Sequence, residues 1–288
     1  MELTKRQIVL LALQFTAVFL FIGRGWQHLY LGFPYYAFFY GNHMRPVVEL
    51  VGMDWVQYLK DPESGKLMVQ FVRNLGWIYL LLAVIALFFQ YISKRVAQVF
   101  VATAVSLLIF LSLSYFLGQA KRVGQFVEYS CQMGTPIFLY LARFGHPLSQ
   151  QFLLWLKIAI ALTFCGHGLY AIGYYPQPGY FMEMISRGLS VDLKTARLLL
   201  ETAGVLDFIL SCLIFLPVRW LVLPALVWAV IWGLITTGAR LFTNIYPDIF
   251  WDTVWRNTPD MLMRFPHFMI PLVALFLVIN HAQRTRSV

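Results

Sequence analysis

Apolar residues run along this chain in long stretches, separated by segments in which polar, aromatic and proline residues gather. A helix needs about 20 residues to cross a bilayer core about 30 Å thick, and several stretches reach or approach that length. They are continuously apolar and lack the alternation of membrane barrel strands. The pattern therefore predicts eight membrane-spanning helices, over 8–26, 75–91, 97–117, 128–142, 152–172, 196–216, 221–237 and 266–279.

Composition supports the same class of protein. Hydrophobic residues make up 60% of the chain and charged residues 12%, against about 45–50% and 25% in soluble domains. We therefore expect an all-α integral membrane protein whose main partner is the lipid bilayer. The formal charge of +9 needs no nucleic acid to explain it, because basic residues beside a membrane interact with anionic lipids.

The basic residues of the short connections predict the orientation. Lys5 and Arg6 precede the first apolar stretch, which no small-residue cleavage site follows, so we expect this helix to be retained. Lys94 and Arg219 lie in connections on the same side. Short loops rich in Lys and Arg are typical of the cytoplasmic side, so both termini are predicted to be cytoplasmic.

The connections on the opposite side are longer and rich in aromatic residues. They cover 30–74, 173–195 and 238–265, and we predict interfacial helices within them. For most of the individual rings, an ordinary aromatic belt is the preferred explanation. Trp251 and Trp255 are four residues apart, so a helix would place both on one face, where they could dock a partner protein.

A short segment occurs twice. The first apolar stretch ends in FIGRG and the fifth in FCGHG, and each is followed by aromatic and proline residues. We infer an internal repeat, with one four-helix unit over 1–147 and another over 148–288. Because four is an even number, the two units are predicted to be parallel. Arg24 of the first copy corresponds to His167 of the second.

Polar residues at the predicted membrane depth are the candidate functional residues. A charge at a helix centre costs about 2.5–3.5 kcal/mol on insertion scales, so it usually faces a partner, a cavity or water. We expect one ligand-binding site in each half, formed by Arg24, His28, Glu128 and Gln132 in the first and by His167, Tyr170, Asp207 and His267 in the second. Arg24 is predicted to pair with Glu128. Snorkelling or simple interhelical hydrogen bonding would explain the same residues without a ligand.

Other chemistry leaves little trace in the sequence. Cys131, Cys165 and Cys212 lie in or beside apolar stretches without a Cys-x-x-Cys pair, so neither a disulfide framework nor a dithiol is indicated. There is no Walker loop, dinucleotide fingerprint or metal-spaced cluster of His and Cys. We therefore predict no metal site.

The pattern of each half resembles a known group of families. A first helix ending in a glycine-rich polar turn, an aromatic-proline outer loop, and a second helix with a glycine (NLGWIYLLLAV and TAGVLDFILSCL) are similar to the DoxX-like membrane families. These include the membrane subunit of thiosulfate:quinone oxidoreductases and the transmembrane domain of vitamin K-dependent carboxylases. The resemblance implies a bacterial inner-membrane location, a quinone, and a membrane or extracytoplasmic redox partner. It assigns no catalytic residue, and two units in one chain depart from the common single-unit form.

Two main hypotheses follow. The first is a DoxX-like protein that binds a quinone or another lipid-soluble ligand near the outer leaflet, with His28, His167 and His267 meeting a carbonyl. The second is a non-catalytic scaffold that docks a partner through its aromatic outer loops. A transporter is less favoured because no broken helices occur at corresponding places, and haem is disfavoured because single histidines at helix ends more often donate hydrogen bonds. Whether the chain is an enzyme stays open.

Overall fold

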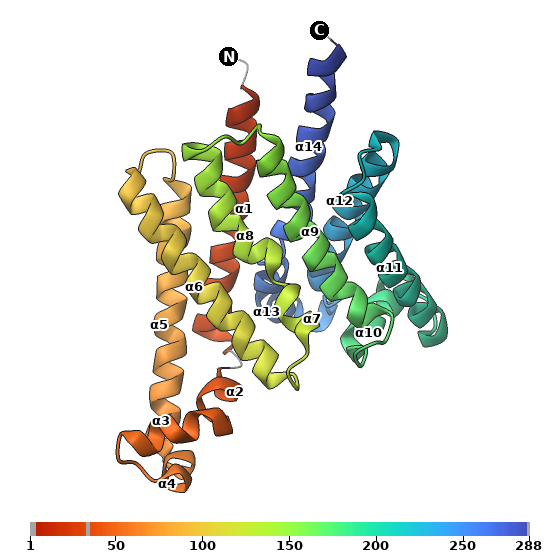
Figure 1. Ribbon diagram of the computed structural model, residues 1–288. Coiled ribbons are helices and arrows are strands. Elements are labelled where there is room, and N and C mark those ends of the chain that lie inside the picture. Colours follow the sequence, from red (N-terminus) through yellow and green to blue (C-terminus); the bar gives the residue numbers. More distant parts are fainter. Residues whose placement is uncertain (1–3, 33–34, 287–288) are drawn as a thin grey trace.

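The computed structural model describes residues 4–32 and 35–286, and every regular element within them is helical (Figure 1). Eight of these helices are long: α1 (Lys5–Tyr30), α5 (Pro62–Leu87), α6 (Lys94–Gly118), α8 (Ser130–Phe144), α9 (Gln150–Ala171), α11 (Leu193–Leu213), α12 (Arg219–Phe242) and α14 (Pro266–Arg286). Shorter helices connect them: α2 (Tyr36–Phe39), η1 (Asn42–Met44), α3 (Arg45–Leu50), α4 (Trp55–Lys60), α7 (Val123–Val127), α10 (Gly179–Leu189), η2 (Pro247–Ile249) and α13 (Phe250–Leu262).

Six helical segments of the described chain are long and apolar enough to cross a membrane. They are α1, α5, α6, α9, α12 and the segment that ends in α14. All eight predicted spans fall on long helices, but α8 and α11 are not among the six. The 15 residues of α8 rise only about 22 Å, and α11 contains four charged residues. The count of eight spans therefore stays a prediction.

The two termini lie on the same side of the molecule, and successive long helices run in opposite directions (Figure 1). The short helices α2 to α4 lie at the opposite end. The predicted outer segments do contain helices, but two of their boundaries were wrong. Helix α5 begins at Pro62, because the Asp61 side chain caps it and proline is favoured in a first turn. Helix α12 continues to Phe242, beyond the predicted end at 237.

Matched glycines allow the first two helices of each half to approach closely. A Cβ atom on Gly25 of α1 would lie 3.1 Å from the carbonyl oxygen of Gly76 on α5. In the second half, a Cβ atom on Gly168 of α9 would lie 3.2 Å from the carbonyl oxygen of Gly204 on α11. Small residues at helix crossings are typical of membrane bundles, where close backbone packing replaces the hydrophobic driving force.

A second pair of glycines joins the halves to each other. A Cβ atom on Gly23 of α1 would lie 2.7 Å from the backbone nitrogen of Met263, in the turn between α13 and α14. A Cβ atom on Gly166 of α9 would lie 2.8 Å from the backbone nitrogen of Glu128, in the turn between α7 and α8. The first helix of each half thus packs against the turn that precedes the last long helix of the other half. This contact positions the polar residues that follow the two glycines.

Candidate functional site

Two matched pairs of polar residues lie beside these glycine contacts. Arg24, which follows Gly23, donates a hydrogen bond of 2.5 Å to Oε1 of Gln132 on α8. His167, which follows Gly166, lies beside His267 of α14, with ring centroids 5.2 Å apart. The correspondence of Arg24 with His167 in the sequence therefore has a counterpart in space.

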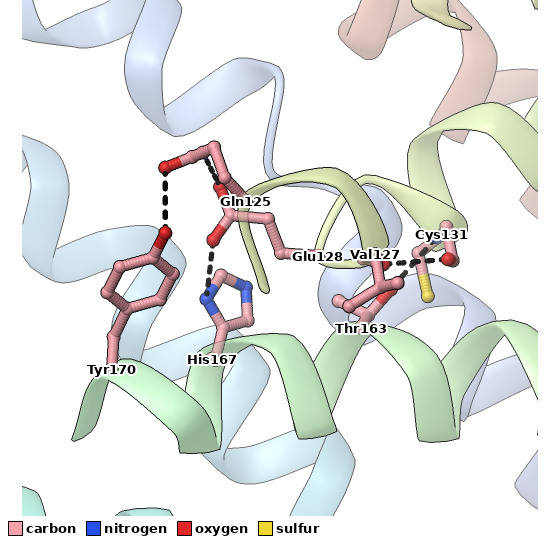
Figure 2. Close-up of polar contacts among 8 residues, drawn as sticks. Gln125, Val127, Glu128, Cys131, Thr163, His167 and Tyr170 are labelled. Atoms are coloured by element: carbon pink, nitrogen blue, oxygen red, sulfur yellow. Dashed lines mark hydrogen bonds and ion pairs between the residues drawn. The ribbon is translucent and has the colours of Figure 1, made fainter. Parts of the chain in front are cut away.

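A second matched pair crosses between the halves. Gln27 of α1 donates a hydrogen bond to the carboxylate of Asp260 on α13. Tyr170 of α9 donates a hydrogen bond of 3.4 Å to the side-chain oxygen of Gln125 on α7, as Figure 2 shows. Asp260 lies seven residues before His267, and Gln125 lies seven residues before Gln132. The same positions therefore make the same kind of contact in both halves.

The first-half site is filled by its own side chains. The guanidinium of Arg24 is fully buried and lies 5.1 Å from the ring centroid of Tyr129. Nδ1 of His28 donates to the carbonyl of Arg24 at 2.6 Å, and its Nε2 is hydrogen-bonded to the hydroxyl of Tyr35 at 2.9 Å. Tyr35 in turn stacks on Phe110. Three of the four predicted residues, Arg24, His28 and Gln132, are thus brought together.

Glu128, the fourth residue predicted for this site, contacts the second half instead. Its carboxylate lies 3.5 Å from Nδ1 of His167, and it accepts a hydrogen bond of 2.5 Å from Gln125 (Figure 2). Arg24 donates to Gln132 and to Gln27. The reason is that the turn between α7 and α8 packs against α9 of the second half, which puts Glu128 beside α9. A single sequence does not reveal this contact.

The second-half site opens into a cavity of about 480 Å³ between α9, α10, α11, α12 and the start of α14. Its wall includes three of the four predicted residues, His167, Asp207 and His267, while Tyr170 is not part of the wall. Most of the remaining lining is apolar. An apolar cavity with a few convergent polar groups is the usual form of a small-molecule site.

Asp207 is buried in this wall and distinguishes it from the first half. The indole N–H groups of Trp228 and Trp232 lie close to its carboxylate, but within the described chain its Oδ1 atom and Nε2 of His167 have no well-aligned hydrogen-bond partner. Asp207 lies three residues after Gly204, and the residue three positions after Gly76 is the buried Tyr79. The carboxyl group of Asp207 therefore occupies, in the second half, the position that the aromatic ring of Tyr79 has in the first half. Buried polar groups normally have partners, so an exception in a cavity wall favours a ligand role.

Two arginines of the cavity wall, Arg240 and Arg264, were missed by the sequence analysis. Both lie in the segment 238–265, which was interpreted as an outer loop, although Arg240 is part of α12. One signal could have revealed Arg264. It lies three residues before His267, as the buried Tyr129 lies three residues before Gln132.

The tryptophans predicted to dock a partner lie on α13, which is helical as expected. Trp251 is 78% exposed and Trp255 is 46% exposed. The ring of Trp255 also packs against Trp26 and Tyr30 of α1, at 4.4 and 5.3 Å between centroids. Trp255 therefore holds α13 against α1, whereas Trp251 is available to other molecules.

The helices and the buried polar clusters at their ends indicate a multi-pass membrane protein. No protein family, curated protein or solved structure matches the chain. Within the described residues, no group of three or more His, Cys, Asp or Glu side chains is placed to hold a metal ion.

Proposed function

We propose that this chain is a multi-pass membrane protein that binds a lipid-soluble ligand with a polar head group, a quinone being one such molecule, in the cavity of its second half. The observation that carries the proposal is the presence of His167, Asp207 and His267 together in the wall of a mostly apolar cavity. A lipid-soluble molecule fits such a site because its apolar body replaces lipid contacts and its head group meets the few polar side chains.

The chemistry of these side chains suits an oxygen-bearing head group. Nδ1 of His267 donates to the carbonyl of Arg264, so its other ring nitrogen is the one available to a ligand. Nδ1 of His167 faces Glu128, and its Nε2 has no partner in the described chain. Imidazole and carboxyl groups can hold or exchange protons at such a head group, and a redox role would use them in this way.

The matched contacts also support an origin of the two halves by internal duplication, with the units 1–147 and 148–288. Matched pairs at Gly23 and Gly166 and at Gly25 and Gly168 argue for this origin, because unrelated bundles have no reason to repeat both contacts in the same register. A DoxX-like relationship and a bacterial inner-membrane location with cytoplasmic termini remain part of the proposal. Reporter fusions after Lys94 and after Asp61 should then report opposite sides, and identical signals would contradict the orientation.

Analysis of the ligand that copurifies with the protein tests the proposal. The protein is purified in detergent, its absorbance is recorded, and an organic extract is analysed by mass spectrometry. We expect a bound lipid-soluble molecule that is reduced in His167→Ala and Asp207→Asn at unchanged yield of folded protein. His43→Ala is the matched control, since His43 is an exposed histidine of η1 outside the cavity. Equal ligand content in all variants would contradict the assignment of the site.

A docking scaffold is the second candidate, and the exposure of Trp251 favours it. Aromatic anchors often dominate protein interfaces. In that case Trp251→Ala should abolish recovery of a partner by crosslinking, while the cavity variants leave recovery unchanged. Trp255→Ala is less informative, because loss of its contacts with Trp26 and Tyr30 would also loosen α13. Recovery that survives Trp251→Ala would exclude docking through this residue.

A further inference from the structure

Two arginines face the cavity of the second half. The charged side chains of its wall are Arg240, Arg264 and Asp207. The carboxylates of Glu128 and Asp260 lie outside the wall, but the charge of Glu128 acts on both arginines and that of Asp260 acts on Arg240. Glu128 lies 3.5 Å from Nδ1 of His167 and accepts a hydrogen bond from Gln125.

Neither arginine of this wall is paired with a carboxylate. The six ion pairs among the described residues all join other side chains. The Nε atoms of Arg240 and Arg264 have no hydrogen-bond partner within that part of the chain. The guanidinium of Arg240 is held between aromatic rings, 4.7 Å from the centroid of Tyr180 and 5.2 Å from that of Phe181. These rings orient the group without neutralising its charge.

Buried guanidinium groups that form no ion pair at such a place favour an anion. Ionisable groups inside a membrane bundle are costly and normally face a partner or a water-filled space. A guanidinium presents its donors as a planar fork that matches a carboxylate or a phosphate. Two neighbouring guanidinium groups in the wall of a mostly apolar cavity therefore favour a ligand that has an acidic head and an apolar tail.

We propose that the second-half cavity binds an amphipathic anion, whose carboxylate or phosphate lies between Arg240, Arg264 and His267 and whose tail follows the wall formed by Leu199, Leu206 and Ile235. This inference rests on the proposed function and narrows its ligand from lipid-soluble molecules in general to acidic ones. The first half offers no equivalent, because Tyr129 occupies the position that corresponds to Arg264.

Four probes with the same or similar apolar bodies test the head group. Dodecanoate, dodecyl phosphate, dodecanol and a short-chain ubiquinone are titrated into the detergent-purified protein, and binding is measured by the quenching of tryptophan fluorescence. We expect both anions to bind at least about tenfold more tightly than dodecanol, as expected for hydrogen bonds to charged groups. The relative affinity of the two anions identifies the carboxylate or the phosphate as the better head group.

Variants of the arginines locate the binding. Arg240→Gln and Arg264→Gln should each weaken the binding of the preferred anion about tenfold or more. Arg264→Lys should retain part of the affinity for that anion. Arg256→Gln is the matched control, since Arg256 is an exposed arginine of α13 that pairs with Asp252. Thermal unfolding of each variant shows whether it is folded, and the comparison of head groups on the unchanged protein does not depend on any variant.

The outcomes separate this inference from the proposed function. Anion binding that weakens with the loss of either arginine supports both. Tight binding of ubiquinone or dodecanol that does not depend on the arginines, but is lost in His167→Ala, overturns the acidic head group and keeps the lipid-soluble ligand. Binding of none of the four probes, together with an empty organic extract, overturns both.

Discussion

The first-half and second-half polar sites of this protein occupy equivalent positions but differ in what fills them. In the first half, the side chains of Arg24, His28 and Gln132 are buried and hydrogen-bonded among themselves and with Tyr35. In the second half, the equivalent region is a cavity whose wall includes Asp207. The comparison shows how matched positions of one helical scaffold can either join helices or line a cavity.

The difference can be traced to a few positions. Tyr79 and Tyr129 contribute buried aromatic rings in the first half, whereas the corresponding positions of the second half hold Asp207 and Arg264. A ring fills space and brings no net charge, while a charged side chain requires a partner or solvent. We therefore expect variants of the first site to affect stability and variants of the second site to affect ligand binding.

The largest expected effect on stability belongs to Arg24→Ala. The substitution removes a buried side chain, leaves a void beside Tyr129 and strands the side-chain oxygens of Gln132 and Gln27. A cost of about 3 kcal/mol or more in unfolding free energy is expected for such a change. Unfolding by denaturant in detergent would measure it. A cost no larger than that of His167→Ala would contradict the contrast between a structural and a ligand site.

Alanine at Gly23 and at Gly166 should have the next largest effects. In each case the new Cβ atom would meet the backbone of the other half at 2.7 or 2.8 Å, where no flexible side chain can move aside. Overpacking of this kind costs about 1–3 kcal/mol, and the two costs should be similar because the contacts are equivalent.

Gly65→Ala is the control for these two glycines. Gly65 lies in α5, and nothing lies within 4 Å of a Cβ atom built there. The substitution should be neutral or slightly stabilising, because alanine favours a helix more than glycine does. A marked cost at Gly23 with none at Gly166 would show that the two halves do not dock in equivalent ways.

Double-mutant cycles on the crossing hydrogen bonds should show smaller and unequal couplings. The bond from Gln27 to Asp260 involves a carboxylate, and we expect a coupling of about 1–2 kcal/mol. The bond from Tyr170 to Gln125 is neutral and measures 3.4 Å, so its coupling should be about 0.5 kcal/mol. Alanine substitutions at the four positions, singly and in pairs, give both values. Equal couplings would remove the distinction between the charged and the neutral contact.

Much of this arrangement could be predicted from the sequence, because it depends on patterns along single helices. Runs of apolar residues predicted the position of every long helix. The internal repeat inferred from the FIGRG and FCGHG motifs stays a prediction. The helix start at Pro62 was missed, because the interpretation followed the apolar residues and overlooked the cap at Asp61.

The rest of the site depends on contacts that no local pattern encodes. Glu128 lies beside His167 only because the turn before α8 packs against α9 of the other half. Arg240 fell within the segment 238–265 that was predicted to be an outer loop, but α12 continues through it and it lies in the cavity wall. Residues at span ends therefore need the tertiary arrangement before their role can be assigned.

The smallest expected effect concerns the caps of the two equivalent helices α5 and α11, which both begin after an aspartate. Asp192 accepts hydrogen bonds from the backbone N–H and the hydroxyl of Thr195, and these bonds hold the pKa of its carboxyl below the ordinary value. A lowered folded-state pKa stabilises the protein above the unfolded-state pKa, which is about 3.9 for aspartate, and this contribution is lost as the pH falls through the folded-state pKa.

Thermal unfolding of the unchanged protein, Asp192→Ala and Asp192→Asn at neutral pH and at about pH 3 would measure it. We expect the difference between Asp192 and alanine to shrink in acid, while the difference between asparagine and alanine stays constant, because asparagine caps a helix without a charge. A constant difference for Asp192 as well would show that its charge does not contribute to this cap.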